Sequence, residues 1–166
     1  MKTNKIARTA MMLALLIVIQ FVTKSFGQIV TGTCVNLILA VTGSLCGIEY
    51  GILISLISPF FAYMLGIGPA FIQIVPAIAV GNAVYVLCLH FLTKRNKYVV
   101  IISSAMVKFI TLYGLIVTFI LPSLGLPENK AAIISASFSW PQLVTATLGG
   151  MLSLIVIKAI NKNIDK

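Results

Sequence analysis

Acidic residues are almost missing from this sequence. Its 166 residues include 3 Asp or Glu against 12 Lys or Arg, which gives a formal net charge of +9, and only 9% of the chain is charged. A soluble domain of ordinary composition is roughly a quarter charged. Because 60% of the residues are hydrophobic, the chain has too little polar surface to cover a water-soluble globule and is too apolar to be disordered. The composition excludes a soluble enzyme and predicts an integral membrane protein.

Motifs for metal, phosphate and hydrolytic chemistry are missing as well. The sequence has no HExxH, no Gly-x-Ser-x-Gly and no GxxxxGK[ST] segment, and it has a single histidine, His90. Its three cysteines lie within apolar runs without metal-ligand spacing. We therefore expect no metal site, no catalytic residues and no cofactor held by this chain. The cations stand at the ends of apolar runs rather than along one polar face, so nucleic acid is not an expected partner.

The apolar runs are long and do not alternate with polar residues, which favours membrane helices over a β-barrel. We predict an all-α membrane protein with a single domain over residues 1–166, folded as a compact bundle of six transmembrane helices. The junction around residues 46–50 is short, so five spans are the alternative to six. The predicted spans cover residues 6–22, 29–46, 50–65, 71–92, 98–121 and 131–160.

The basic residues predict the orientation of the bundle. With the N-terminus inside, nine Lys or Arg fall in inner segments and two, Lys24 and Lys130, fall in outer loops. Cytoplasmic loops of membrane proteins carry an excess of Lys and Arg. We therefore expect both termini in the cytoplasm. The nine inner cations are Lys2, Lys5, Arg8, Lys94, Arg95, Lys97, Lys158, Lys162 and Lys166.

The twelfth cation, Lys108, lies inside the fifth predicted span. Ten residues separate it from Tyr98, which places it about 15 Å deep in a helix that rises 1.5 Å per residue. A lysine at this depth usually faces a bundle interior or a watery cavity and needs a counter-charge. Either an anionic ligand supplies that charge, or Lys108 snorkels or reaches Glu49 and has a structural role.

Polar side chains on the last three predicted spans accompany this lysine. Helices with aligned polar faces could line one cavity, or the same groups could form hydrogen bonds between helices. Trp140 could stack on a flat ligand or simply pack. The candidate ligand contacts are Lys108, Gln73, Asn82, Ser139, Trp140 and Gln142.

Two further features concern the backbone and the loops. Pro141 leaves the carbonyl of Ser137 without its helical donor, and such a carbonyl could accept a hydrogen bond from a ligand or mark a packing kink. The predicted outer segments 23–28 and 123–130 are polar and contain Gly or Pro. They either connect spans or cover a site that opens outward.

Small residues repeat on one face of the first predicted helix, at Ala7, Ala10 and Ala14, and such a face allows another helix to approach closely. The opening Lys5-Ile-Ala-Arg-Thr-Ala-Met-Met-Leu-Ala14, the segment Gly66-Ile-Gly-Pro-Ala-Phe-Ile-Gln-Ile-Val-Pro76 and the following Gly81-Asn-Ala83 give the chain a family likeness. Together with the size and the six spans, they resemble the substrate-binding S component of an energy-coupling factor (ECF) transporter, a vitamin-uptake system of bacteria and archaea.

This resemblance implies a function for a chain without an ATP site. An S component captures a vitamin or related micronutrient at the outer face of the cell membrane. It then docks on a membrane T component that is carried by two cytosolic ATPases, which use the ATP. The resemblance places the T component on the face formed by Ala7, Ala10 and Ala14. The unpaired Lys108 favours an anionic ligand.

Two other classes of protein fit parts of the sequence. A small six-helix protein of the rod-shape machinery would bind protein partners instead of solutes, and it would not need Lys108 or the aligned polar faces. A membrane enzyme acting on lipids would need acidic residues for a metal or a nucleophile, and this chain has few.

Overall fold

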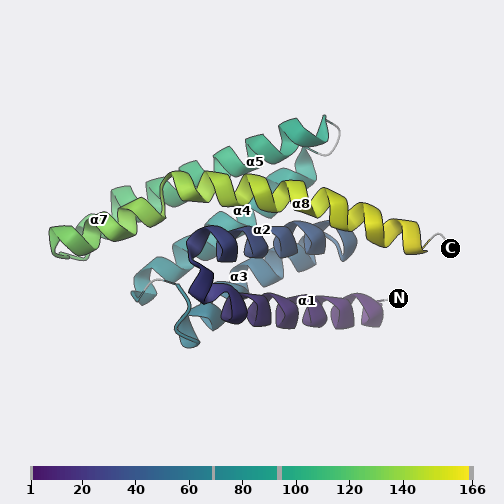
Figure 1. Ribbon diagram of the computed structural model, residues 1–166, viewed down its shortest axis with the longest axis horizontal. Coiled ribbons are helices and arrows are strands. Elements are labelled where there is room, and N and C mark those ends of the chain that lie inside the picture. The colour runs from purple at the N-terminus through teal and green to yellow at the C-terminus, as the bar shows by residue number, and fades with distance from the viewer. Residues whose placement is uncertain (1, 69, 93–94, 165–166) are drawn as a thin grey trace.

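The computed structural model describes residues 2–68, 70–92 and 95–164, and all regular secondary structure in these ranges is helical. The helices form an elongated bundle (Figure 1). In chain order they are α1 (Lys2–Thr23), η1 (Lys24–Phe26), α2 (Gln28–Leu45), α3 (Ile48–Met64), η2 (Ile72–Ile74), α4 (Val75–Phe91), α5 (Lys97–Leu112), η3 (Tyr113–Ile120), α6 (Leu121–Ser123), α7 (Glu128–Ser137) and α8 (Trp140–Ile164).

Five helical stretches are long and apolar enough to cross a membrane, and α3 adds a sixth apolar helix of 17 residues. The prediction of an all-α membrane bundle is thus confirmed. The five stretches are Lys5–Phe26, Gln28–Leu45, Ile72–Phe91, Lys97–Ser123 and Glu128–Lys162.

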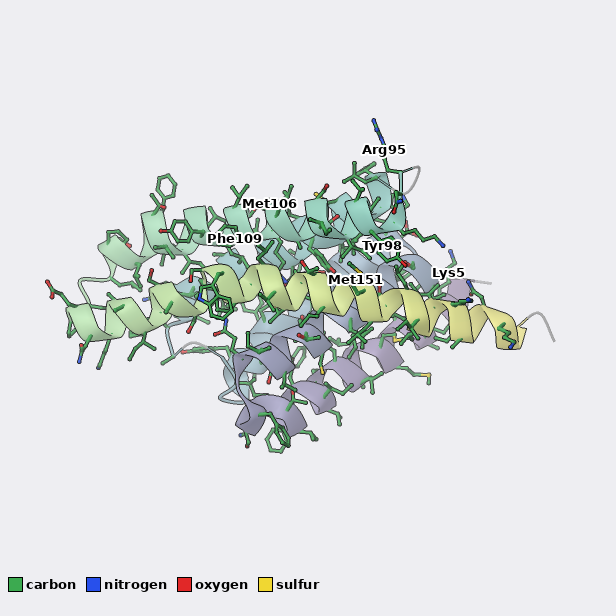
Figure 2. All side chains as sticks on the ribbon, turned by 45° about the horizontal axis from the view of Figure 1, so that its top comes forward. Lys5, Arg95, Tyr98, Met106, Phe109 and Met151 are labelled. Atoms are coloured by element: carbon green, nitrogen blue, oxygen red, sulfur yellow. The ribbon has the colours of Figure 1, made fainter. Side chains whose placement is uncertain are left out.

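The two ends of the bundle differ in charge as the sequence predicts. The start of α1, the end of α8 and the turn between α4 and α5 lie at one end, while the α1–α2 junction and α7 lie at the other (Figure 1). Lys5 and Arg95 lie toward the end with the termini (Figure 2). Lys94 and Lys166 are outside the described residues. We call the end with the termini the inner end and the opposite end the outer end.

The last predicted span, 131–160, is divided in the structure. Helix α7 ends at Ser137 and α8 begins at Trp140, so Phe138 and Ser139 connect two helices. Pro141 is the second residue of α8, where its missing N–H and fixed φ are tolerated. The sequence predicts one span over residues 131–160 and does not predict this break.

Glycines allow the closest helix contacts. A Cβ added at Gly51 of α3 would lie 2.8 Å from the Cα of Gly43 in α2, and one added at Gly149 of α8 would lie 2.6 Å from the Cβ of Asn36 in α2. Small residues commonly bring membrane helices together in this way. Helix α2 therefore packs closely against both α3 and α8.

Candidate functional site

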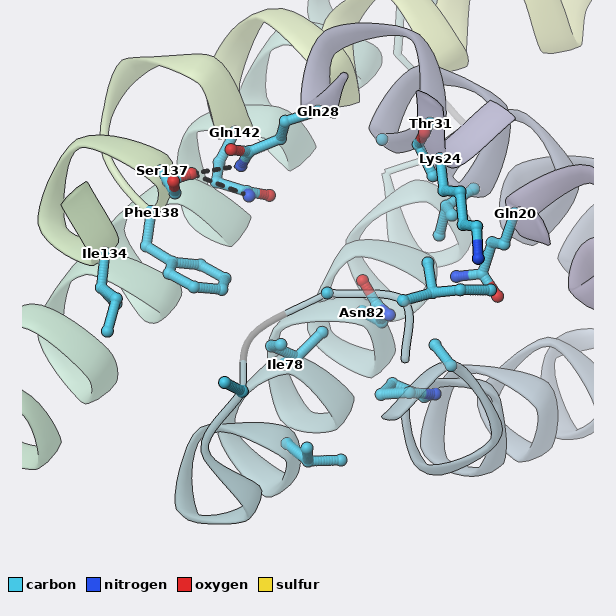
Figure 3. Close-up of a pocket in the computed structure, with 18 of the residues that line it drawn as sticks. Gln20, Lys24, Gln28, Thr31, Ile78, Asn82, Ile134, Ser137, Phe138 and Gln142 are labelled. Atoms are coloured by element: carbon cyan, nitrogen blue, oxygen red, sulfur yellow. Dashed lines mark hydrogen bonds between the residues drawn. The ribbon is translucent and has the colours of Figure 1, made fainter. Parts of the chain in front are cut away.

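A cavity of about 550 Å³ extends from the outer end of the bundle to its buried middle. Its rim includes the α1–α2 junction, the α3–α4 connection and α7, and its walls come from α2, α4, α5 and α8 (Figure 3). Small-molecule sites typically measure about 300–1,000 Å³. The cavity has the size of a metabolite site.

Lys108 lies at the buried end of this cavity. Its Nζ donates to Oδ1 of Asn36 at 2.5 Å and to Oδ1 of Asn82 at 2.6 Å. The same Nζ lies 5.4 Å from the centre of the Tyr85 ring. Lys108, Asn36 and Asn82 are each at most 3% exposed. The lysine thus joins α5 to α2 and α4 in the middle of the bundle.

These contacts answer the question of which groups hold Lys108 in the structure. Its partners are two amide oxygens and an aromatic face rather than the carboxylate of Glu49. A lysine ammonium carries three N–H donors. Two are used by the asparagines, so one N–H and the formal positive charge remain for a group inside the cavity.

The rest of the cavity has the same sign of charge. Lys24 of η1 and Lys130 of α7 line its outer part and are exposed. None of the described residues that line the cavity is Asp or Glu. A concave site lined by charges of one sign attracts ligands of the opposite sign. The lining therefore favours an anion.

Two glutamine side chains converge on the break between α7 and α8. The Nε2 atom of Gln28 donates to the carbonyl oxygen of Ser137, and that of Gln142 donates to the same oxygen at 3.2 Å (Figure 3). This carbonyl is the one that the sequence predicts to lose its helical donor through Pro141. In the structure the two side chains supply the missing donors and link α2, α7 and α8.

The candidate residues from the sequence fall into two groups. Lys108, Asn82 and Gln142 line the cavity. The other three, Gln73, Ser139 and Trp140, are not among the lining residues.

The three candidates that do not line the cavity lie at the surface or in the α7–α8 connection. Gln73 is exposed on η2. Ser139 lies in the α7–α8 connection, where its hydroxyl donates to the Ala136 carbonyl at 2.8 Å. Trp140 is 63% exposed. Ser139 and Trp140 are therefore close to lining residues in the chain, namely Phe138 and Gln142, but do not line the cavity themselves.

Several lining residues escaped the sequence analysis, namely Gln20, Lys24, Gln28, Asn36 and Lys130. Lys24 and Lys130 were assigned only as outer-loop cations. Gln20 and Asn36 are amides within apolar helices, and each is at least nine-tenths buried. A large polar side chain in a membrane helix is a signal that could have found both.

Helix α1 has a second face away from the cavity. Ala7, Ala10 and Ala14 are exposed, whereas Leu16 and Gln20 are buried. Only 17% of the α1 span is buried inside the bundle, compared with 50% of the span that contains α4. The small-residue face is therefore available to another protein or to lipid.

A comparison with protein families gives a match over residues 4–161, to the substrate-specific component of ECF transporters. The chain belongs to this family. No curated protein and no solved structure is significantly similar to it.

Family membership settles several expectations. An ECF substrate-specific component is a non-enzymatic transport subunit in a membrane, so the enzyme hypothesis is excluded and the transport hypothesis is confirmed at the level of the family. The family also implies a small-molecule substrate and docking with a T component and ATPases. It favours transport over the rod-shape alternative.

Proposed function

We propose that this subunit captures a small anionic, water-soluble micronutrient such as a vitamin from the outer side of a bacterial or archaeal cell membrane. The ligand occupies the 550 Å³ cavity, with its carboxylate or phosphate on the Lys108 ammonium. The observation that carries the proposal is the spare N–H of a buried lysine at the end of a cavity whose described lining has no acid.

The exposed and the buried lysines of the cavity have different roles in binding an anion. Lys24 and Lys130 are exposed at the outer part, where their field raises the local concentration of anions. Lys108 is 2% exposed, and a hydrogen bond from a buried charge to an anion is stronger than one in water. Asn36 and Asn82 hold its Nζ in place, so little ordering is needed when a ligand arrives.

A purely structural role for Lys108 is the competing interpretation. The lysine does join three helices, but a neutral donor would serve two amide oxygens without the cost of burying a charge. The placement of this charge on the cavity, together with Lys24 and Lys130, supports a ligand as its counter-ion.

Binding by the purified protein tests the proposal. We would identify any small molecule that co-purifies by native mass spectrometry and then titrate vitamins of different charge. The anions are pantothenate, nicotinate, biotin and pyridoxal phosphate; nicotinamide is neutral and thiamine is cationic. We expect stoichiometric binding of one or more anions and no binding of thiamine.

Lysine variants then locate the anion. Lys108→Met should lower the affinity for the bound anion about 10- to 100-fold, because a hydrogen bond to a charged group contributes about 1.5–3 kcal/mol. The double variant Lys24→Met/Lys130→Met changes exposed residues only and should weaken binding less while the protein stays folded. Lys97→Met/Lys162→Met is the matched control at the inner end. Binding of thiamine in preference to anions, or wild-type affinity in both cavity variants, would contradict the proposal.

Docking on the T component is the second part of the proposed function. The exposed face of Ala7, Ala10 and Ala14 lets a partner helix approach closely, and the two cytosolic ATPases of the complex use the ATP. The double variant Ala10→Trp/Ala14→Trp should abolish co-purification with the T component and leave ligand affinity unchanged. Ile155→Trp on α8, where Ile155 is 67% exposed, is the control. Equal co-purification of the two variants would exclude this face.

A further inference from the structure

Gln20 has a buried side-chain amide whose oxygen lacks a hydrogen-bond partner in the described protein. It lies in the last turns of α1, on the side of the helix that carries Leu16 into the core. It is 7% exposed and lines the cavity. In Figure 3 its amide lies on the same side of the cavity as Lys24.

The amide oxygen of Gln20 has no hydrogen-bond partner among the described residues, although it is buried. The nearby cation does not satisfy it, because the Lys24 Nζ lies over the Phe21 ring, 4.5 Å from its centre. A buried polar group without a hydrogen-bond partner lowers the stability of the folded protein. An apolar residue of the same size would avoid this cost in the empty protein.

The other amides of the cavity differ in this respect. Asn36, Asn82, Gln28 and Gln142 each make at least one side-chain hydrogen bond within the protein. Among these lining amides, Gln20 is therefore the one whose oxygen has no hydrogen-bond partner in the part of the chain that the structure describes. Amide oxygen and nitrogen exchange places by a simple rotation, so the side chain can offer either an acceptor or a donor to a ligand.

We propose that Gln20 binds an uncharged hydrogen-bonding group of the substrate, a hydroxyl or an amide, while Lys108 binds its anionic group. This inference rests on the proposed function and narrows the substrate class. A plain carboxylate would leave Gln20 unpaired, whereas an anion with a hydroxyl, amide or ureido group would satisfy both residues. A site built around such a hydrogen bond discriminates strongly against ligands that lack the group.

Because of the position of Gln20, a bound substrate would contact two separate helices. Lys108 belongs to α5 and Gln20 belongs to α1. A substrate that fits both residues bridges the helix with the exposed alanine face to the core of the bundle.

The variant Gln20→Met tests this inference with two measurements, because methionine has a similar volume and no comparable hydrogen-bonding group. The first measurement is the melting temperature of the ligand-free protein in detergent. We expect a rise of about 2–4 °C, since removing an unpaired buried amide relieves its desolvation cost. A fall would show that Gln20 has a structural partner and would overturn the inference.

The second measurement is the affinity for two carboxylates: pantothenate, which carries hydroxyl and amide groups, and benzoate, which has no hydrogen-bonding group besides its carboxylate. The wild type should bind pantothenate at least about 10-fold more tightly. Gln20→Met should lose this preference, with the larger change for pantothenate. Equal affinities in the wild type, or a preference that survives in the variant, would overturn the inference.

A control variant and the separate outcomes for the two proposals complete the experiment. Gln73→Met makes the same chemical change at an exposed residue outside the cavity and should alter neither measurement. A wild-type protein that binds none of the four anions of the vitamin set would contradict the proposed function, and the inference would fail with it. Wild-type binding that depends on Lys108 but not on Gln20 would overturn the inference alone.

Discussion

The inner and outer halves of the bundle are packed differently, on either side of the layer formed by Lys108, Asn36 and Asn82. In the inner half, Gly43 and Gly51 bring α2 and α3 into backbone contact. The outer half has a buried core of its own around Ile74, Leu112 and Ile116, but it also contains the cavity and the break between α7 and α8.

The difference between the close α2–α3 contact and the cavity shows how a small membrane protein can be stable and still bind a ligand. Dense packing gives stability through dispersion contacts and tolerates little change in volume. A cavity forgoes these contacts, and the polar groups around it are partnered by one another or by a ligand. We expect substitutions at the close α2–α3 contact to lower the free energy of unfolding strongly, and substitutions around the cavity to change stability less and ligand affinity more.

The largest effect on stability should come from Gly51→Ala. The new Cβ would meet the Gly43 Cα and the Val86 Cγ1, each at 2.8 Å, and the Gly43 backbone cannot yield without separating α2 from α3. We expect a loss of about 2 kcal/mol in the free energy of unfolding, as for other overpacked cores. Thermal melting in detergent measures it.

Gly114→Ala is the matched control in the outer half. No heavy atom outside the local helix lies within 4 Å of a Cβ added at Gly114, and alanine is the better helix former. Its melting temperature should equal or slightly exceed that of the wild type. If the two variants melted at the same temperature, the contrast between the halves would be refuted.

A smaller effect should follow from Gln28→Ala at the outer end. Gln28 is exposed, and Gln142 continues to donate to the Ser137 carbonyl when Gln28 is removed. We expect a loss of at most about 1 kcal/mol, the contribution of an ordinary hydrogen bond.

The double variant Gln28→Ala/Gln142→Ala sharpens this test. It leaves the Ser137 carbonyl without either side-chain donor, so its cost should exceed the sum of the two single losses. Urea titration of the three variants measures the coupling. Additive losses would show that the two glutamines do not substitute for each other.

Part of the site could be predicted from the sequence because some residues are costly in a membrane wherever the helix points. Lys108, Asn82 and Gln142 belong to this class, and all three line the cavity. Gln73 and Trp140 look similar in sequence, but both side chains are exposed and neither lines the cavity. Trp140 and Gln142 both lie in the first turn of α8, so the side of the helix that each occupies, not its position along the chain, decides which of them lines the cavity.

The sequence by itself determined the class of this protein: its scarcity of charge and its long apolar runs require membrane helices, and its basic residues orient them. It also determined that Lys108 needs a partner. Only the tertiary structure decided which partners it has, because Asn36 on α2 and Asn82 on α4 reach the lysine through packing between helices distant in the chain. The same packing left the buried Gln20 oxygen without a partner beside the cavity.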